Sequence, residues 1–201
     1  KYLVCFSPEA FLDLISAFSS IFNARSILDG TSLTSKDGIG KIIAVENLNI
    51  CDNGLNPNNI GTAFFDGEGT PTQRVSLIES GKLVNLLHSE ATARAFNTRP
   101  TGHAGLGAKV SVGHDWFEIS KNEHMNNKIP DIDQLNTELN YVEIDSLSAL
   151  HAGIKASQGS FSLPFNGWHI KGGEKISIEA ATLAGDIREV LQHIVSIDNK
   201  I

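Results

Sequence analysis

The sequence of 201 residues predicts an α+β protein with a mostly antiparallel β-sheet and about four helices, including an N-terminal and a C-terminal amphipathic helix. The first observation is a large number of short apolar runs separated by glycine, asparagine and proline, which is typical of strands joined by turns. The second is that only a few segments carry apolar residues at helical spacing. The third is the chain length, which suits a single domain covering residues 1–201.

The N-terminal segment predicts a strand followed by a helix. Residues 2–6 form an apolar run, and Ser7-Pro8-Glu9 then supplies a cap hydroxyl, a proline for the first helical position and an acid near the positive helix end. The helix is expected to fade over residues 24–30. Its apolar face is expected to pack into the core. That face comprises Phe11, Leu12, Leu14, Ile15, Phe18, Ile21 and Phe22.

The middle of the chain predicts a β-hairpin and a short helix. Residues 73–78 and 82–88 are β-rich, and Glu79-Ser80-Gly81 between them predicts a three-residue turn with glycine at the left-handed position. The alanine-rich residues 88–96 predict a helix. Further strands are expected over residues 41–45, 48–51 and 62–65, with a polar loop over residues 31–40.

The C-terminal half predicts strands with two more helices. The Gly172-Gly173 pair predicts a two-residue hairpin turn. Helices are expected over residues 145–156 and 185–197, and residues 121–140 are expected to form a long exposed excursion. The strands are expected over residues 109–112, 116–120, 141–144, 161–163, 167–171 and 174–179.

The charge and the cysteine content exclude some function classes. The formal net charge is −7 and the pI is about 5.4, so we expect no direct binding to nucleic acid, which requires clustered lysine and arginine. The sequence has no signal-peptide pattern and no long apolar span, so we expect a cytoplasmic protein without a membrane segment. Cys5 and Cys51 are interpreted as two buried thiols, although a disulfide between them stays open.

An acidic loop, Asp66-Gly67-Glu68-Gly69, is the most conspicuous candidate site. Catalytic carboxylates would need environments that separate their pKa values, which a glycine-lined turn does not obviously supply. The carboxylates could instead bond nearby backbone amides or pair with Arg74. A third interpretation is that they dock a partner or a peptide. Thr101-Gly102-His103 could place a hydroxyl and an imidazole beside this loop.

Residues 61–103 also carry a family resemblance. The segment has a D-x-E-G loop, a T-x-R run into L-I-x-x-G-x-L, a T-A-R helix and a P-T-G step, in that order. In this pattern it resembles the C-terminal domain of the TldD/PmbA proteins, once described as modulators of DNA gyrase. The resemblance implies that an N-terminal domain is absent from this chain. The matching residues are Asp66, Glu68, Gly69, Arg74, Leu77, Ile78, Gly81, Leu83, Thr92, Ala93, Arg94, Pro100, Thr101 and Gly102.

The resemblance implies a zinc metallopeptidase system. In TldD-like members two histidines three residues apart, with a glutamate between them, bind the metal, but no two of the seven histidines here are three or four residues apart. Thr101-Gly102-His103 looks more like the PmbA/TldE side of the family, the partner that lacks the metal. We therefore expect no metal ligand, cofactor or catalytic residue in this chain, with zinc held by a TldD-like partner.

The sequence thus predicts a subunit of a TldD/TldE-type zinc metalloprotease that degrades or matures peptides, not catalytic by itself. Its partners are expected to be a TldD-like subunit or a second copy, together with a peptide substrate. The residues expected to bind substrate or partner are Asp66, Glu68, Arg74, Thr101 and His103. One alternative is a non-catalytic assembly module that forms homodimers. Another is an independent hydrolase that uses Asp66, Glu68 and His103.

Overall fold

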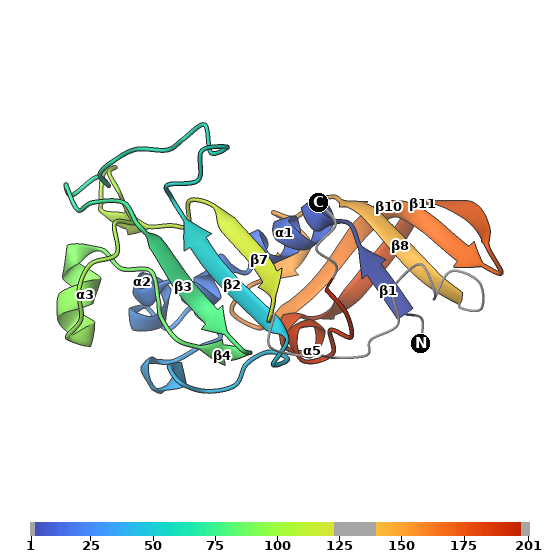
Figure 1. Cartoon of the computed structure of the whole chain (residues 1–201), viewed down its shortest axis with the longest axis horizontal. Coiled ribbons are helices and arrows are strands. Elements are labelled where there is room, and N and C mark those ends of the chain that lie inside the picture. The colour runs from blue at the N-terminus through green and yellow to red at the C-terminus, as the bar shows by residue number, and fades with distance from the viewer. Residues whose placement is uncertain (1–2, 123–139, 198–201) are drawn as a thin grey trace.

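The computed structural model describes residues 3–122 and 140–197. Two sheets lie beside each other in Figure 1, one from the middle of the chain and one dominated by its C-terminal third. Most pairings are antiparallel, and the described residues include four α-helices, so the predicted α+β class is confirmed. None of the helices in the described ranges is long and apolar enough to cross a membrane.

The larger sheet has the strand order β1-β8-β10-β11, and β9 pairs with β10. Only the pairing of β1 with β8 is parallel. The Gly172-Gly173 turn is confirmed, because both glycines have positive φ, of 59° and 82°. The strands are β1 (Leu3–Phe6), β8 (Asn140–Leu147), β9 (Ile154–Lys155), β10 (Ser160–Lys171) and β11 (Glu174–Asp186).

The two strands predicted over residues 161–163 and 167–171 are one continuous strand, β10. A register shift between Phe165 and Gly167 interrupts its pairing. At Gly167 a Cβ atom would lie 1.9 Å from the carbonyl oxygen of Glu143, so only glycine permits this approach of β8.

The smaller sheet has the order β4-β3-β2-β7, with every pairing antiparallel. The predicted hairpin is present, but its turn is Ser80-Gly81 rather than three residues, since Glu79 already pairs with Lys82. Both turn residues have positive φ, which is typical of a two-residue type I′ turn. The strands are β2 (Leu48–Asn53), β3 (Arg74–Glu79), β4 (Lys82–Leu83) and β7 (Phe117–Lys121), and a separate pair comprises β5 (Ala104–Gly105) and β6 (Ser111–Val112).

The helix predicted from Ser7 starts as expected but ends earlier. Ser7 Oγ accepts a hydrogen bond from the Ala10 amide at 3.0 Å, and α1 spans Pro8–Ala17. The chain continues as a 3-10 helix, η1 (Ser19–Phe22), and then as α2 (Ala24–Leu28). The prediction of a single helix through position 22 was therefore wrong. Hydroxyl groups of Ser32 and Thr34 bind the Ser20 and Ile21 carbonyls, which replaces the α-helical bonding there.

Two C-terminal helix predictions also differ from the structure. The helix over residues 145–156 was wrong, because β8 continues to Leu147 and pairs with β10. The last helix, α5, spans only Ile187–Gln192, since the preceding residues to Asp186 pair with β10. The predicted excursion over residues 121–140 lies almost wholly outside the described residues.

Three predicted strands in the middle of the chain are absent or shorter. Residues 41–45 and 62–65 form only isolated bridges, at Ile42 and Phe65, and the strand over residues 109–112 is reduced to β6. Lys36–Gly38 forms the short 3-10 helix η2 within the predicted loop. The helix predicted over residues 88–96 is α3 (Glu90–Phe96), capped by Ser89 and ended by Asn97 in the left-handed conformation.

One hydrophobic core joins both sheets. Phe18, at the end of α1, contacts Phe161 of the larger sheet with ring centroids 6.2 Å apart. Phe22 in η1 contacts Phe117 of the smaller sheet at 5.7 Å. Both phenylalanines are 1% exposed, so the N-terminal apolar face is core, as predicted.

Candidate functional site: a cavity above a buried histidine–aspartate cluster

A cavity of about 280 Å³ lies at the end of the smaller sheet. Asp66 of the acidic loop, residues 102–105, residue 111 and residues 113–115 border it. Glycines contribute much of the wall, among them Gly54, Gly61, Gly102 and Gly113, so backbone peptide groups are close to the cavity. His103, His114, Asp66 and Asp115 are its titratable side chains.

The Asp66 carboxylate is fully engaged by backbone amides. Its Oδ1 accepts hydrogen bonds from the amides of Glu68 and Thr70, each at 2.9 Å, which closes the glycine-rich turn. Its Oδ2 accepts from the Ala104 amide at 3.0 Å, and the Gly67 amide donates to the Ala104 carbonyl at 2.7 Å. Asp66 therefore fixes the acidic loop against β5, one wall of the cavity.

Glu68 and Arg74 form contacts outside the cavity. Glu68 Oε2 accepts from the Glu90 amide at 2.8 Å, at the positive N-terminus of α3. Arg74 pairs with Glu118 at 3.2 Å, so the suggested pairing of Arg74 with the acidic loop does not occur in the described residues. Of the five predicted site residues, only Asp66 and His103 border the cavity. Arg74 lies on β3, between β4 and β2 in the smaller sheet.

Glu118, on β7, binds the side chains of two asparagines at and just after the end of β2. Its Oε1 accepts from the side-chain amides of Asn53 at 2.7 Å and Asn56 at 2.8 Å. The Cys51 thiol donates to Oε2 at 3.3 Å, and burial, followed by this hydrogen bond, raises the pKa of Cys51 to about 12. Cys51 is a buried free thiol, so the disulfide left open by the sequence is not formed, and Cys5 is half-buried rather than buried as predicted.

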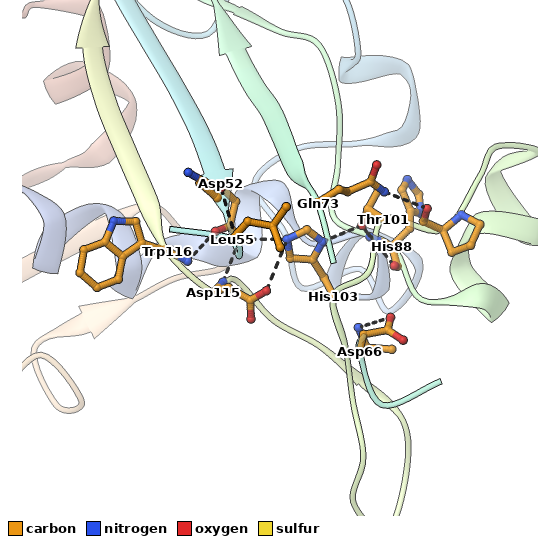
Figure 2. Close-up of polar contacts among 12 residues, drawn as sticks. Asp52, Leu55, Asp66, Gln73, His88, Thr101, His103, Asp115 and Trp116 are labelled. Carbon is orange, nitrogen blue, oxygen red and sulfur yellow. Dashed lines mark hydrogen bonds and ion pairs between the residues drawn. The ribbon is translucent and has the colours of Figure 1, made fainter. Parts of the chain in front are cut away.

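Thr101 holds His88 and His103 in place. Its Oγ1 accepts from the His88 amide at 2.7 Å and donates to the His88 carbonyl at 3.2 Å. His103 Nδ1 lies 2.9 Å from the same oxygen. Thr101 Oγ1 and His103 Nδ1 therefore share a hydrogen bond whose donor is set by the tautomer of the His103 ring. Figure 2 shows the His103 ring between Thr101 on one side and Asp52 and Asp115 on the other.

Asp52 is the buried anchor of the cluster, with 0% exposure at the end of β2. Its Oδ1 accepts from the Trp116 amide at 2.6 Å and its Oδ2 from the Asp115 amide at 2.9 Å. Burial raises the pKa of Asp52, but the contact with the His103 imidazole and the hydrogen bonds from the Trp116 and Asp115 amides outweigh burial, so its pKa lies below the usual value. Asp52 is therefore a buried carboxylate anion at neutral pH.

The other titratable groups of the cluster differ in their preferred charge. Burial raises the pKa of Asp115, against an opposing effect of His103. Burial also lowers the pKa of His114, whose ring stacks on Phe117 with centroids 4.5 Å apart. His114 is consequently a neutral ring at pH 7.

His103 Nε2 is where these groups converge. It lies 3.4 Å from Asp52 Oδ2 and 3.8 Å from Asp115 Oδ2. The His103 side chain is fully buried, and Nε2 has no partner with hydrogen-bond geometry among the described residues. The proximity to Asp52 is therefore an electrostatic contact rather than a well-aligned hydrogen bond.

His88 gives the first testable prediction. It is 4% exposed, and burial lowers its pKa from 6.5 to about 4, against a smaller opposing effect of Thr92. Between these two pKa values His88 binds a proton in the unfolded chain but not in the folded chain. The stabilisation is therefore complete above pH 6.5 and is lost as the pH falls toward 4. We expect His88 to account for a loss of about 2 kcal/mol between pH 7 and pH 5.

Urea unfolding of wild type, His88→Asn and His151→Asn at both pH values measures this contribution. The His88 variant should lose less stability between pH 7 and pH 5 than wild type does. The exposed His151 is the matched control, and its variant should keep the wild-type difference. An unchanged difference in the His88 variant would contradict the prediction.

Sequence reasoning identified His103 but missed Asp52, Asp115 and His114. The sequence prediction placed Asp52 in a turn-rich segment after an apolar strand. The signal that could have identified it is a carboxylate directly after such a strand. Asp115 lies 63 positions away from it. No local pattern brings the two together, because β2 and β7 pair only in the folded sheet.

A family model described as the PmbA/TldA metallopeptidase C-terminal domain matches residues 1–201. A metalloprotease TldD homologue of Buchnera aphidicola from Schizaphis graminum is 30% identical over 184 residues, which cover 90% of this chain and 36% of that protein. The metalloprotease PmbA of Escherichia coli O157:H7 is 26% identical over 166 residues, covering 82% and 34%.

Solved structures share the fold. A proposed modulator of a DNA gyrase from Thermotoga maritima has a TM-score of 0.85 at 26% identity, covering 98% of this chain and 44% of that one. TldE from Thermococcus kodakarensis has a TM-score of 0.76 at 22% identity, covering 95% and 43%. The present chain thus spans less than half the length of these relatives.

Proposed function

Because the chain belongs to the PmbA/TldA metallopeptidase C-terminal domain family, we propose that it forms a peptide-holding wall in a cytoplasmic, TldD/TldE-type zinc metalloprotease. The zinc ion would be held by a TldD-like partner, and the substrate would be a peptide that is degraded or matured. The observation that carries this proposal is the glycine-lined cavity at the end of the smaller sheet. Such a wall lets an extended peptide approach backbone groups directly.

The buried cluster does not fit a catalytic zinc ion. Such an ion needs three protein ligands and an open position for water or substrate. Both carboxylate oxygens of Asp52 are engaged by backbone amides, and the His103 side chain is fully buried. Among the described residues no group of three or more His, Cys, Asp or Glu side chains is arranged to hold a metal ion. The chemistry proposed for this chain is therefore peptide binding rather than metal-assisted hydrolysis.

Exposed apolar side chains, next in sequence to residues that border the cavity, favour a second candidate, an assembly module that forms homodimers. Phe64 is 82% exposed and Leu106 is 73% exposed, and Ile60 is fully exposed. Large apolar side chains gathered on loops mark protein contacts more often than isolated ones do. The same surface would also suit a contact with a TldD-like subunit.

Peptidase measurements on the full-length protein that contains this chain separate the candidates. We expect no activity and no stoichiometric zinc for the protein alone. Activity is expected after mixing with a TldD-like subunit from the same source, with zinc retained by that subunit. An inert homodimer that ignores the added subunit would support the assembly module. Stoichiometric zinc and activity in the protein alone would overturn the proposal.

A further inference from the structure

We propose that the loop of residues 54–65 recognises an uncharged, apolar side chain of a bound peptide where the cavity opens to solvent. Phe65 is assigned as its main contact, and Glu118 as the residue that positions the loop. That the ligand is a peptide rests on the proposed function. The preference for an apolar side chain rests on the composition, exposure and surroundings of the loop.

Loop 54–65 is apolar and carries no charge. It projects beyond the end of β2 in Figure 1. None of its residues is Asp, Glu, Lys or Arg, although these types make up 19% of the chain. Nucleic acids and anionic lipid headgroups require clustered cations, so the loop does not suit them. Its large apolar side chains are nevertheless exposed, which is typical of a surface that binds an apolar group. They are Leu55, Ile60, Phe64 and Phe65.

Phe65 joins this loop to the cavity. Ala63 and Phe65 border the cavity, whereas Ile60 and Phe64 do not. Since Phe65 is also 59% exposed, its ring stands where the cavity meets solvent. A peptide side chain that enters the cavity would therefore bury part of this ring. A subunit docked on the loop would cover Ile60 and Phe64 as well, so the two occupants make different contacts.

The part of the cavity next to Phe65 disfavours charge. Both oxygens of the neighbouring Asp66 are engaged by backbone amides and are not available to a cation. Burial raises the pKa of Asp115 and lowers the pKa of His114, so the surroundings favour the neutral form of each side chain. A charged side chain of a ligand would meet the same desolvation cost. An apolar one avoids that cost and gains free energy from the area it buries.

Glu118 holds the loop in place. Its Oε1 accepts a hydrogen bond from the side-chain amide of Asn56 at 2.8 Å, and the Asn56 carbonyl accepts from the Thr62 hydroxyl at 3.0 Å. At the other end of the loop the Thr72 amide donates to the Phe64 carbonyl at 3.0 Å. Because the loop is bonded at both ends before a ligand arrives, little conformational entropy is lost on binding.

Peptide binding to the full-length protein that contains this chain tests the inference without a partner subunit. The probes are N-acetylated, C-amidated peptides of serine and glycine that carry a central phenylalanine, serine or lysine. By fluorescence anisotropy the phenylalanine peptide should bind at least about tenfold more tightly than the other two. Equal affinities, no measurable binding of any peptide, or tighter binding of the lysine peptide would overturn the inference.

Phe65→Ser tests the assigned contact. This variant should bind the three peptides equally and should unfold near the wild-type temperature, because Phe65 is already largely exposed. Ile176→Ser is the matched control, since Ile176 is 51% exposed on β11 of the larger sheet. Phe64→Ser tests the neighbouring exposed ring, which does not border the cavity. Both of these variants should keep the phenylalanine preference.

An unchanged preference in Phe65→Ser would contradict the assignment. A dimer that Phe64→Ser dissociates, together with equal peptide affinities in the wild type, would assign the loop to a second copy instead of a peptide. That result would also overturn the inference.

Glu118→Ala tests the positioning role. We expect faster hydrogen exchange over residues 54–62 and a roughly fivefold weaker affinity for the phenylalanine peptide. Glu118→Gln keeps an oxygen that can accept from Asn56, so it should restore most of the affinity. Glu143→Ala is the control, because Glu143 pairs with Lys175 on the larger sheet. Unchanged exchange and affinity in Glu118→Ala would refute the positioning role.

These measurements need neither zinc nor a partner subunit. If the phenylalanine preference is absent while peptidase activity appears on mixing with a TldD-like subunit, the loop assignment fails and the proposed function stands. If the preference is present and the mixture is inactive, the proposed function fails and the loop assignment stands.

Discussion

Replacing Asp52 by alanine is expected to lower the free energy of unfolding by about 3 to 5 kcal/mol, because two amides that lose their acceptor cost roughly 1–3 kcal/mol each. The substitution leaves the Trp116 and Asp115 amides without their acceptor and removes the carboxylate nearest to His103. Urea unfolding at pH 7 measures the loss. The Asp37→Ala control should stay within about 0.5 kcal/mol of wild type, because Asp37 is exposed.

The Asp52 contribution should also depend on pH. Its pKa in the folded protein lies below the ordinary value of 3.8, so the unfolded chain takes up a proton first as the pH falls. The stabilisation is present above that value and is lost as the pH falls through the folded-state pKa. Asp52→Asn keeps the shape of the side chain but cannot accept hydrogen bonds from both amides. We therefore expect its free energy of unfolding to lie between that of wild type and that of Asp52→Ala. A loss below 1 kcal/mol for Asp52→Ala would refute the anchoring role.

Gly102→Ala is expected to destabilise the protein by about 2 to 5 kcal/mol, from an unfavourable left-handed backbone and a steric clash. Gly102 has a φ of 76°, and a Cβ atom there would lie 2.4 Å from the Pro71 carbonyl oxygen. Because Gly102 joins Thr101 to His103, the shift needed to relieve the clash should also displace the imidazole. We expect the thermal midpoint and any peptide affinity to fall together.

Two other glycines separate the backbone cost from the clash. Gly69 also has a positive φ, of 81°, but a Cβ atom there meets nothing within 4 Å, so Gly69→Ala should cost about 1 kcal/mol. Gly113 has open space and no positive φ, so Gly113→Ala should be nearly neutral in stability. If thermal unfolding ranks the three variants in any other order, the clash with Pro71 is not the dominant effect.

Elements that depend on neighbouring residues were predictable. Ser7-Pro8-Glu9 starts α1, and Gly172-Gly173 turns the chain between β10 and β11, because a cap or a two-residue turn needs only the residues that form it. The ordered motif of residues 61–103 was enough to indicate the family. Where an apolar run could be helix or strand, as in residues 145–156, local pattern failed, since the free hydrogen-bonding edge of β10 selected a strand.

The sequence alone determined the α+β class, the hairpins, the N-terminal apolar face of the core and the family. The tertiary structure alone decided that Asp66 closes a turn against Ala104, that Glu68 meets the start of α3, and that His103 faces Asp52 and Asp115. The physical reason is that the charge and hydrogen bonding of a side chain depend on what surrounds it in space. Asp52 and Asp115 become neighbours only when β2 and β7 pair. The same folding excludes water from the Asp52 carboxylate.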